Sequence, residues 1–211
     1  FLMKVLVLTD SLALCRKHVD EIILYEQTYP YLLQKKFSNI DFVFTSIGGA
    51  TIKQIFLQLT YYKFFKPDIV IIQCGIVDCA PRALTEFENK VLKKIPFFKL
   101  SSGIIYYLRK YRAYKYTSLN KFNDYCSRIN KLLDKKTRIY CLGILPAFKK
   151  YEEKVPGIQN SVQEYNEVLK KHFTFISNSD FTEDAILSDL FHLNSKGHKI
   201  IFKKLSNIIS N

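Results

Sequence analysis

The chain has 211 residues, of which 48% are hydrophobic, 24% are charged and 15% are aromatic, and it carries 32 Lys and Arg against 19 Asp and Glu. This length suits one α/β domain with a sizeable core, the composition excludes a disordered or collagen-like chain, and no apolar run approaches the roughly 18 residues of a membrane-spanning helix. The net charge of +13 fits an anionic partner (nucleic acid, a membrane surface or an acidic polymer), and it equally fits a general bias toward lysine.

The N-terminus enters a strand-like run almost at once. Met3 is the only methionine and Lys4–Leu8 follows it, so we expect Met3 to be the native start and residues 1–2 to be additions. The parts of a secretory signal peptide do not occur in order. The five cysteines are odd in number and form no Cys-x-x-Cys pair, which disfavours a disulfide framework or a zinc site. These features favour a reducing, cytoplasmic location.

Short apolar runs alternate with amphipathic stretches, which is the pattern of βαβ units around a mostly parallel sheet. The predicted strands are Val5–Leu8, Phe42–Thr45, Ile69–Gln73, Ile139–Gly143 and Phe173–Ile176. Each is continuous and apolar, as expected when helices cover both faces of the sheet. The predicted helices are Ile52–Tyr62, Val162–His172 and about Ser195–Ile209. We therefore predict one domain, residues 3–211, with an α/β three-layer sandwich around a central, mostly parallel five-stranded sheet.

Residues 83–135 separate the third and fourth predicted strands by more than a simple crossover requires. Within them, residues 91–121 contain eight bases and no acid. The bases are Lys93, Lys94, Lys99, Arg109, Lys110, Arg112, Lys115 and Lys121, and the interleaved aromatics are Phe97, Phe98, Tyr106, Tyr107, Tyr111, Tyr114 and Tyr116. We expect an inserted helical cap. It is either a rim that meets an anionic, sugar-like or membrane partner, or a solvated basic face on a helix whose aromatics are core.

A serine follows the first predicted strand directly, in the run Thr9-Asp10-Ser11-Leu12. A side chain at this place points out of the carboxyl edge of the sheet, where ligands bind in open α/β folds. The free N–H groups of a following helix start can stabilise negative charge beside it. The structural alternative is an ordinary helix N-cap, for which Asp and Ser are favoured.

Three further segments carry possible chemistry. Gly48-Gly49 follows the second strand, where a glycine can offer a bare N–H to a ligand or simply form a tight turn. Gly75-Ile76-Val77-Asp78 closes the third strand in the same way. Near the C-terminus, Asp189 precedes His192 by three residues, so its carboxylate can reach Nδ1 and leave Nε2 free as a base. A histidine packed on the last helix is the alternative.

Taken together and in this order, these segments resemble the SGNH, or GDSL-type, hydrolase family. Thr9-Asp10-Ser11-Leu12 is similar to the Gly-Asp-Ser-Leu block, Gly49 matches the glycine of the second block, and Asp189 and His192 match the Asp-x-x-His block. The resemblance implies that Ser11 is the nucleophile, that His192 is its base and that Asp189 orients His192. It also implies an oxyanion hole built from the N–H groups of Ser11 and Gly49, with no metal and no organic cofactor.

The third block departs from the family pattern, because Val77 stands where the family has an asparagine that donates to the oxyanion. Losing one such donor costs on the order of a hundred- to a thousandfold in rate. Arg82 is the first candidate for a substitute donor and could instead clamp a carboxylate or phosphate of the substrate. Gln73 is the second candidate. We predict Asp10, Asp78 and Arg82 to be substrate-binding residues.

The resemblance implies acyl transfer from a small-molecule or carbohydrate ester. Since residues 75–82 resemble members associated with bacterial surface polysaccharide biosynthesis, the specific expectation is a carbohydrate O-deacetylase or O-acetyltransferase in that process. The alternative is a degraded SGNH scaffold that binds glycans with little turnover. Membrane-surface contact through residues 91–121 is a further expectation, and nucleic acid becomes the least favoured partner.

Overall fold

The computed structural model describes residues 2–92, 94–95 and 100–210, so Lys93, Phe97, Phe98 and Lys99 of the predicted cap lie outside the described residues. Its centre is a five-stranded parallel sheet in the order β4-β1-β5-β6-β7. The strands are β1 (Lys4–Thr9), β4 (Asp41–Ser46), β5 (Ile69–Gln73), β6 (Arg138–Leu142) and β7 (Thr174–Ile176). The predicted fold class is confirmed, and the predicted strands match these bounds to within one residue at each end.

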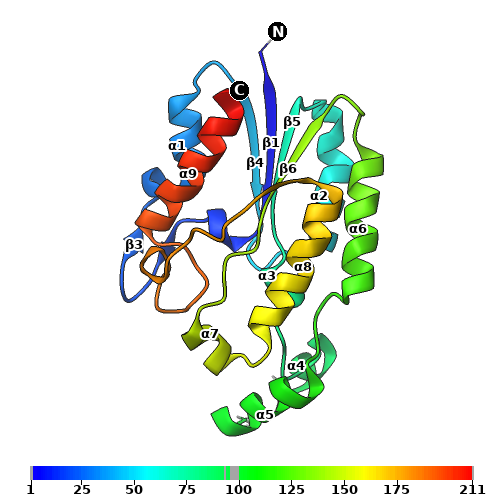
Figure 1. Ribbon diagram of the computed structural model, residues 1–211, viewed down its shortest axis with the longest axis vertical. Coiled ribbons are helices and arrows are strands. Elements are labelled where there is room, and N and C mark those ends of the chain that lie inside the picture. Colours follow the sequence, from blue (N-terminus) through cyan, green and yellow to red (C-terminus); the bar gives the residue numbers. More distant parts are fainter. Residues whose placement is uncertain (1, 93, 96–99, 211) are drawn as a thin grey trace.

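Helices cover both faces of this sheet (Figure 1). On one face lie α2 (Ile52–Tyr62), α6 (Leu119–Leu132) and α8 (Ile158–His172), and on the other lie α1 (Tyr29–Lys36) and α9 (Ser195–Ser210). Side chains on the two sides of β1 belong to two separate cores. Leu6 and Leu8 pack in the core under α2, α6 and α8, and Val5 and Val7 pack in the core under α1 and α9. None of the described helices is long and apolar enough to cross a membrane.

Short elements connect these layers. They are the 3-10 turns η1 (Ser11–Ala13), η2 (Tyr25–Gln27), η3 (Lys63–Phe65) and η4 (Glu183–Ala185), the antiparallel pair β2 (Arg16–Lys17) and β3 (Ile22–Ile23), and the helices α3 (Ile76–Cys79), α4 (Glu86–Leu92), α5 (Ser102–Arg112) and α7 (Lys149–Lys154). Most of them gather at the carboxyl edge of the sheet, which is the lower end of the molecule in Figure 1.

The predicted cap is shorter than residues 83–135, because α6 is part of the sandwich. Phe122, Cys126 and Ile129 lie one turn apart on one face of α6 and are fully buried in the core that α2 and α8 share. The ring of Phe122 lies 4.8 Å from the ring of Tyr165 on α8. Of the described helices in the predicted cap, α4 and α5, which precede α6, lie outside the sandwich.

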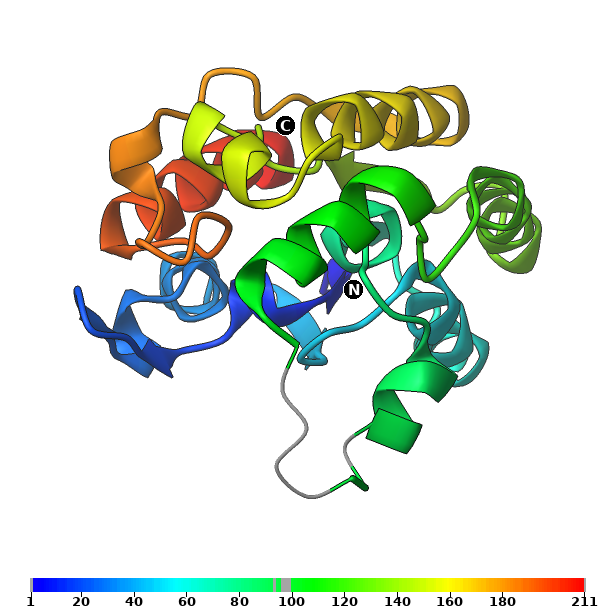
Figure 2. The same cartoon turned by 90° about the horizontal axis from the view of Figure 1, so that it is seen from below.

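Helix α5 lies across the carboxyl edge of the sheet (Figures 1 and 2). None of its residues is buried, and Tyr106, Tyr107 and Tyr111 are all exposed. The aromatics of this helix are therefore not core, which removes one of the two interpretations of the cap.

The position of α6 makes a prediction about stability. Phe122→Ala should lower the free energy of unfolding by about 3–5 kcal/mol, because it empties a fully buried aromatic site. Tyr107→Ala, in the same predicted cap but 60% exposed, should change it by less than about 0.5 kcal/mol. Urea denaturation followed by circular dichroism measures both. Equal, small effects would mean that α6 is a detachable cap after all.

Candidate active site

Ser11 stands where β1 turns out of the sheet. Asp10 caps the turn η1 by accepting the N–H of Leu12 at 2.9 Å, and Ser11 is the first residue of that turn. The Oγ of Ser11 lies 3.0 Å from Nε2 of His192. The buried strand end thus holds the serine at the carboxyl edge with its hydroxyl against an imidazole.

His192 is fixed in turn by Asp189. Nδ1 of His192 lies 2.6 Å from Oδ2 of Asp189, and the N–H groups of His192 and Phe191 donate to Oδ1 at 3.0 and 3.2 Å. Burial opposes the ionisation of Asp189, but these hydrogen bonds prevail and hold its pKa well below its usual range. The carboxylate is therefore charged at neutral pH, and it orients Nε2 of His192 toward Ser11.

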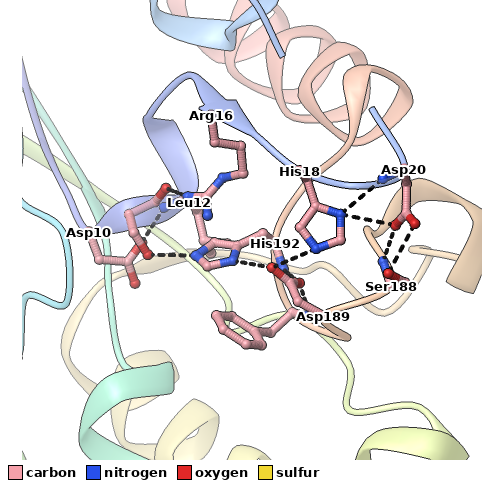
Figure 3. A network of polar contacts seen from close by, with 10 residues as sticks. Asp10, Leu12, Arg16, His18, Asp20, Ser188, Asp189 and His192 are labelled. Atoms are coloured by element: carbon pink, nitrogen blue, oxygen red, sulfur yellow. Dashed lines mark hydrogen bonds and ion pairs between the residues drawn. The ribbon is translucent and has the colours of Figure 1, made fainter. Parts of the chain in front are cut away.

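A second histidine stands behind the carboxylate. Nε2 of His18 lies 4.0 Å from Oδ2 of Asp189, and Nδ1 of His18 lies 3.2 Å from the carboxylate of Asp20. Asp20 accepts the N–H and the hydroxyl of Ser188 at 2.6 and 3.0 Å, which ties it to the residue before Asp189 (Figure 3). The contacts form one continuous chain from Ser11 to Ser188.

Arg16 supports the nucleophile from the same β2–β3 hairpin. Its Nη2 donates to the backbone oxygen of Ser11 at 2.6 Å. Nothing in the sequence singles out Arg16 or His18, because strands of two residues carry no periodicity and the run Arg16-Lys17-His18 has the composition of a solvated loop.

The predicted oxyanion donors lie on neighbouring strand ends. Gly49 follows β4 with a φ of +72°, a left-handed conformation that favours glycine, and it is exposed. Within the described residues, the N–H groups of Ser11 and Gly49 donate to no other backbone or side-chain group. Both remain available to a ligand.

Val77, which stands where the family has an asparagine, leaves this position without a side-chain donor. Val77 lines the cavity beside Ser11. Gln73 does not replace it, because its side chain is 2% exposed and accepts the Tyr29 hydroxyl at 2.5 Å on the α1 side of the sheet. Arg82 does line the cavity, and its Nη2 lies 3.5 Å from the carbonyl oxygen of Val77. Of the two candidate substitutes, only Arg82 lines the cavity.

Asp10 and Asp78 are not substrate contacts, which corrects the sequence-based prediction. Both are fully buried, and neither lines the cavity. Asp78 accepts the N–H of Ile52 at 3.0 and 3.2 Å and so holds the start of α2, just after the Gly49 turn. Burial raises the pKa of each to about 7, and the charge of Asp78 adds to this for Asp10. Their role is to brace the turns that carry the N–H donors.

The cavity at this edge has a volume of about 270 Å³. Its walls come from the nucleophile turn, the Asp-x-x-His loop, the turn after β5, α5 and α7. The lining residues are Ser11, Ile76, Val77, Ala80, Pro81, Arg82, Arg109, Tyr151, Lys154, Val155, Asp189 and Phe191. Because Arg109 belongs to α5, the inserted segment contributes directly to the candidate site.

Comparisons with known proteins place the fold. No protein-family model matches the chain, and no curated protein is detectably similar to it in sequence. Solved structures are similar: a lipase/acylhydrolase from Enterococcus faecalis has 14% identity and a TM-score of 0.67 over 99% of this chain and 95% of its own.

Two further structures have the same architecture. A member of the lipolytic G-D-S-L family from Veillonella parvula has 13% identity and a TM-score of 0.61, covering 99% of both chains. A catalytic mutant of an acetylxylan esterase from Geobacillus stearothermophilus has 14% identity and a TM-score of 0.57 over 96% of this chain and 92% of its own. The chain therefore has the fold of the GDSL-type hydrolases, as the sequence resemblance implies.

The buried carboxyl of Asp78 predicts a pH-dependent stability. Above about pH 4, Asp78 has lost its proton in the unfolded chain but keeps it in the folded protein. The free energy of unfolding therefore falls as pH rises, and it levels off above the folded pKa of about 7. Asp78→Asn removes this pH dependence. The difference in unfolding free energy, variant minus parent, should therefore rise by roughly 1–2 kcal/mol between pH 5 and pH 7.

The unfolding free energies of variant and parent are compared at each pH, because another buried group changes the stability of both proteins in the opposite direction. Burial lowers the pKa of His198 to about 4, so this imidazole makes stability rise with pH over part of the same range. Asp124→Asn, which removes a carboxylate that is 64% exposed, serves as the control for the loss of one surface charge. Urea midpoints at pH 5, 6, 7 and 8 measure all three proteins. A constant difference for Asp78→Asn would contradict the raised pKa.

Proposed function

We propose that the protein is a serine esterase that works through an acyl-enzyme on Ser11. The observation that carries this proposal is the hydrogen-bonded chain from Ser11 through His192 to Asp189 at the wall of a cavity. An ordinary helix cap would not need an imidazole against the serine hydroxyl, nor a charged carboxylate against that imidazole. The GDSL-type fold supports the same assignment.

The residues suggest a mechanism in which every proton has a carrier. Nε2 of His192 takes the Ser11 proton as Oγ attacks the acyl carbonyl, and the N–H groups of Ser11 and Gly49 receive the oxyanion. His192 then passes the proton to the leaving alcohol oxygen, which leaves the acyl group on Ser11. A water molecule repeats the sequence, with His192 again as base, and releases the carboxylic acid. Asp189 stabilises the imidazolium form of His192 in both halves.

We further propose an acylated carbohydrate as the substrate. The aromatic wall formed by Tyr151 and Phe191, whose rings stack at 6.0 Å and 24°, suits the face of a sugar ring. One structure of similar fold is named as an acetylxylan esterase. The resemblance of residues 75–82 to members associated with surface polysaccharide biosynthesis supports an O-deacetylase, or an O-acetyltransferase in which a sugar hydroxyl replaces water.

A second candidate function rests on Val77. With one oxyanion donor missing, the same cavity could bind an acylated glycan with little turnover. This glycan-binding module would keep its affinity for the ligand when the Ser11 hydroxyl is removed, whereas an esterase would lose its turnover.

Removal of the nucleophile or its base tests the esterase. Ser11→Ala and His192→Ala should each lower kcat for 4-nitrophenyl acetate by at least about a thousandfold, because the nucleophile and its base act as one unit. A serine-directed fluorophosphonate should label the parent at Ser11 and should fail to label His192→Ala. His172→Ala, at a histidine that binds Asn123 away from the cavity, is the control. Turnover that persists in Ser11→Ala would sink the assignment.

Restoring the asparagine tests the oxyanion argument. Val77→Asn should raise kcat by about ten- to a hundredfold, since it adds a donor to the cavity wall beside Ser11. KM should change much less, because the oxyanion exists only in the transition state. Val77→Leu controls for side-chain size without adding a donor. An Asn variant no faster than the Leu variant would show that the oxyanion already has its full set of partners.

A further inference from the structure

Three cations from three separate segments line the cavity of the nucleophile. Arg82 follows α3, Arg109 belongs to α5 and Lys154 ends α7. The carboxylate in the lining is Asp189, which is already engaged by His192. The cavity therefore carries an excess of positive charge beside the serine.

These cations have no acidic partner among the described residues. The guanidinium of Arg82 lies over the ring of Tyr116, 4.7 Å from its centroid, and its other contact is the long one to the Val77 carbonyl. Arg109 donates through Nη1 to the carbonyl oxygen of Lys154 at 3.1 Å. The Nε atoms of both arginines are buried and donate to nothing in the described chain. Both side chains are thus held in place and keep unused donors.

Two nearby bases that do not line the cavity, Arg112 and Lys115, have acidic partners. Arg112, one turn after Arg109 on α5, makes a two-pronged ion pair with Glu88 at 2.9 and 3.1 Å. Lys115 lies 3.0 Å from Glu164. Arg112 and Lys115 thus have acidic partners, whereas Arg82 and Arg109, which line the cavity with Ser11, have none among the described residues.

Burial and mutual repulsion both oppose the positive charges of the two arginines. Burial lowers the pKa of Arg109, and the positive charge of Arg82 lowers it further. Like charges in a partly buried site repel unless an anion lies between them. Guanidinium groups are also the side chains best suited to bind a carboxylate or phosphate through two hydrogen bonds.

On the basis of the proposed esterase function, we propose that the cavity binds an acyl ester that also bears a carboxylate or phosphate group. This anionic group is held between Arg82 and Arg109. A sugar acid or a sugar phosphate has this chemistry. Lys154, at the same wall, adds long-range attraction. The cavity volume of about 270 Å³ lies just below the range of ligand pockets, about 300 to 1,000 Å³, which favours a substrate of about monosaccharide size.

Three synthetic acetyl esters separate charge from reactivity. They are 4-acetoxybenzoate, its neutral methyl ester and 4-acetoxyphenyl phosphate. For each ester, kcat/KM is divided by the rate constant of its uncatalysed hydrolysis by hydroxide. The anion preference is this value for an anionic ester divided by the value for the neutral ester. We expect a preference of at least about tenfold for one or both anionic esters, falling as NaCl is raised from 0.05 to 0.5 M. The carboxylate and phosphate esters show which anion the site favours.

The variants assign the preference to residues. Arg109→Gln and Arg82→Gln should each lower the anion preference by about ten- to a hundredfold, as expected for a lost charged hydrogen bond. Lys110→Gln is the matched control, because it removes the same charge from the same helix at a residue outside the cavity lining. No preference in the parent, or an equal loss in Lys110→Gln, would overturn the proposal.

A binding measurement separates this proposal from the esterase assignment. Calorimetric titration of Ser11→Ala with 4-acetoxybenzoate and with 4-acetoxyphenyl phosphate should show binding of at least one, at least tenfold weaker once Arg109→Gln is added. Turnover of the neutral ester without binding or preference for either anion overturns the anion site and keeps the esterase. Binding of an anion without turnover of any ester keeps the site and overturns the esterase.

Discussion

Thr9 lies in register between Ser46 of β4 and Gln73 of β5, and the candidate site depends on this alignment. Because the strands are parallel and end at one level, the turns that follow them meet at the same edge. The Thr9 hydroxyl donates to the Ser46 hydroxyl at 2.8 Å, so the ends of β1 and β4 are also joined by side chains. A shift of one residue in this register would separate the N–H groups of Ser11 and Gly49.

Buried carboxyls stabilise the turns at that edge by accepting their N–H groups. Asp10 caps the turn that carries Ser11, and Asp78 caps the helix that follows Gly49. Each satisfies helix-start N–H groups that would otherwise be unpaired in the interior. Their raised pKa values, both about 7, show that burial outweighs these hydrogen bonds. The protein thus accepts a local cost in stability where it holds its N–H donors in place, as is common at functional sites.

The sheet was predictable from sequence because its strands are continuous apolar runs. The β5 run Ile69–Gln73 is buried throughout, so its composition reports its position directly. Ser11, Asp189 and His192 were singled out because each follows or precedes a regular element at short range. Their mutual geometry was not predictable, since Ser11 and His192 are 181 positions apart in the chain.

Features that depend on long-range packing were missed or misplaced. The sequence places α6 in the cap because residues 83–135 together exceed the length of a simple crossover, and only the contacts of α6 with α2 and α8 place it in the sandwich. The roles of Asp10 and Asp78 were wrong for a related reason: a carboxyl beside a catalytic motif has the same sequence signal whether it points into the cavity or beneath it. The basic segment gave no sign of which of its cations would face the site.

The cations beside Ser11 also bear on the missing oxyanion donor. Coulombic stabilisation needs proximity and not hydrogen-bond geometry, and one unit charge about 6 Å from an oxyanion contributes roughly 3 kcal/mol at an effective dielectric of about 20. This is comparable to the loss of one donor, which is about 3–4 kcal/mol. A substrate anion between Arg82 and Arg109 would cancel much of that field. Anionic substrates should therefore gain through a lower KM, while the acyl-transfer step on neutral esters keeps the full benefit of the positive cavity.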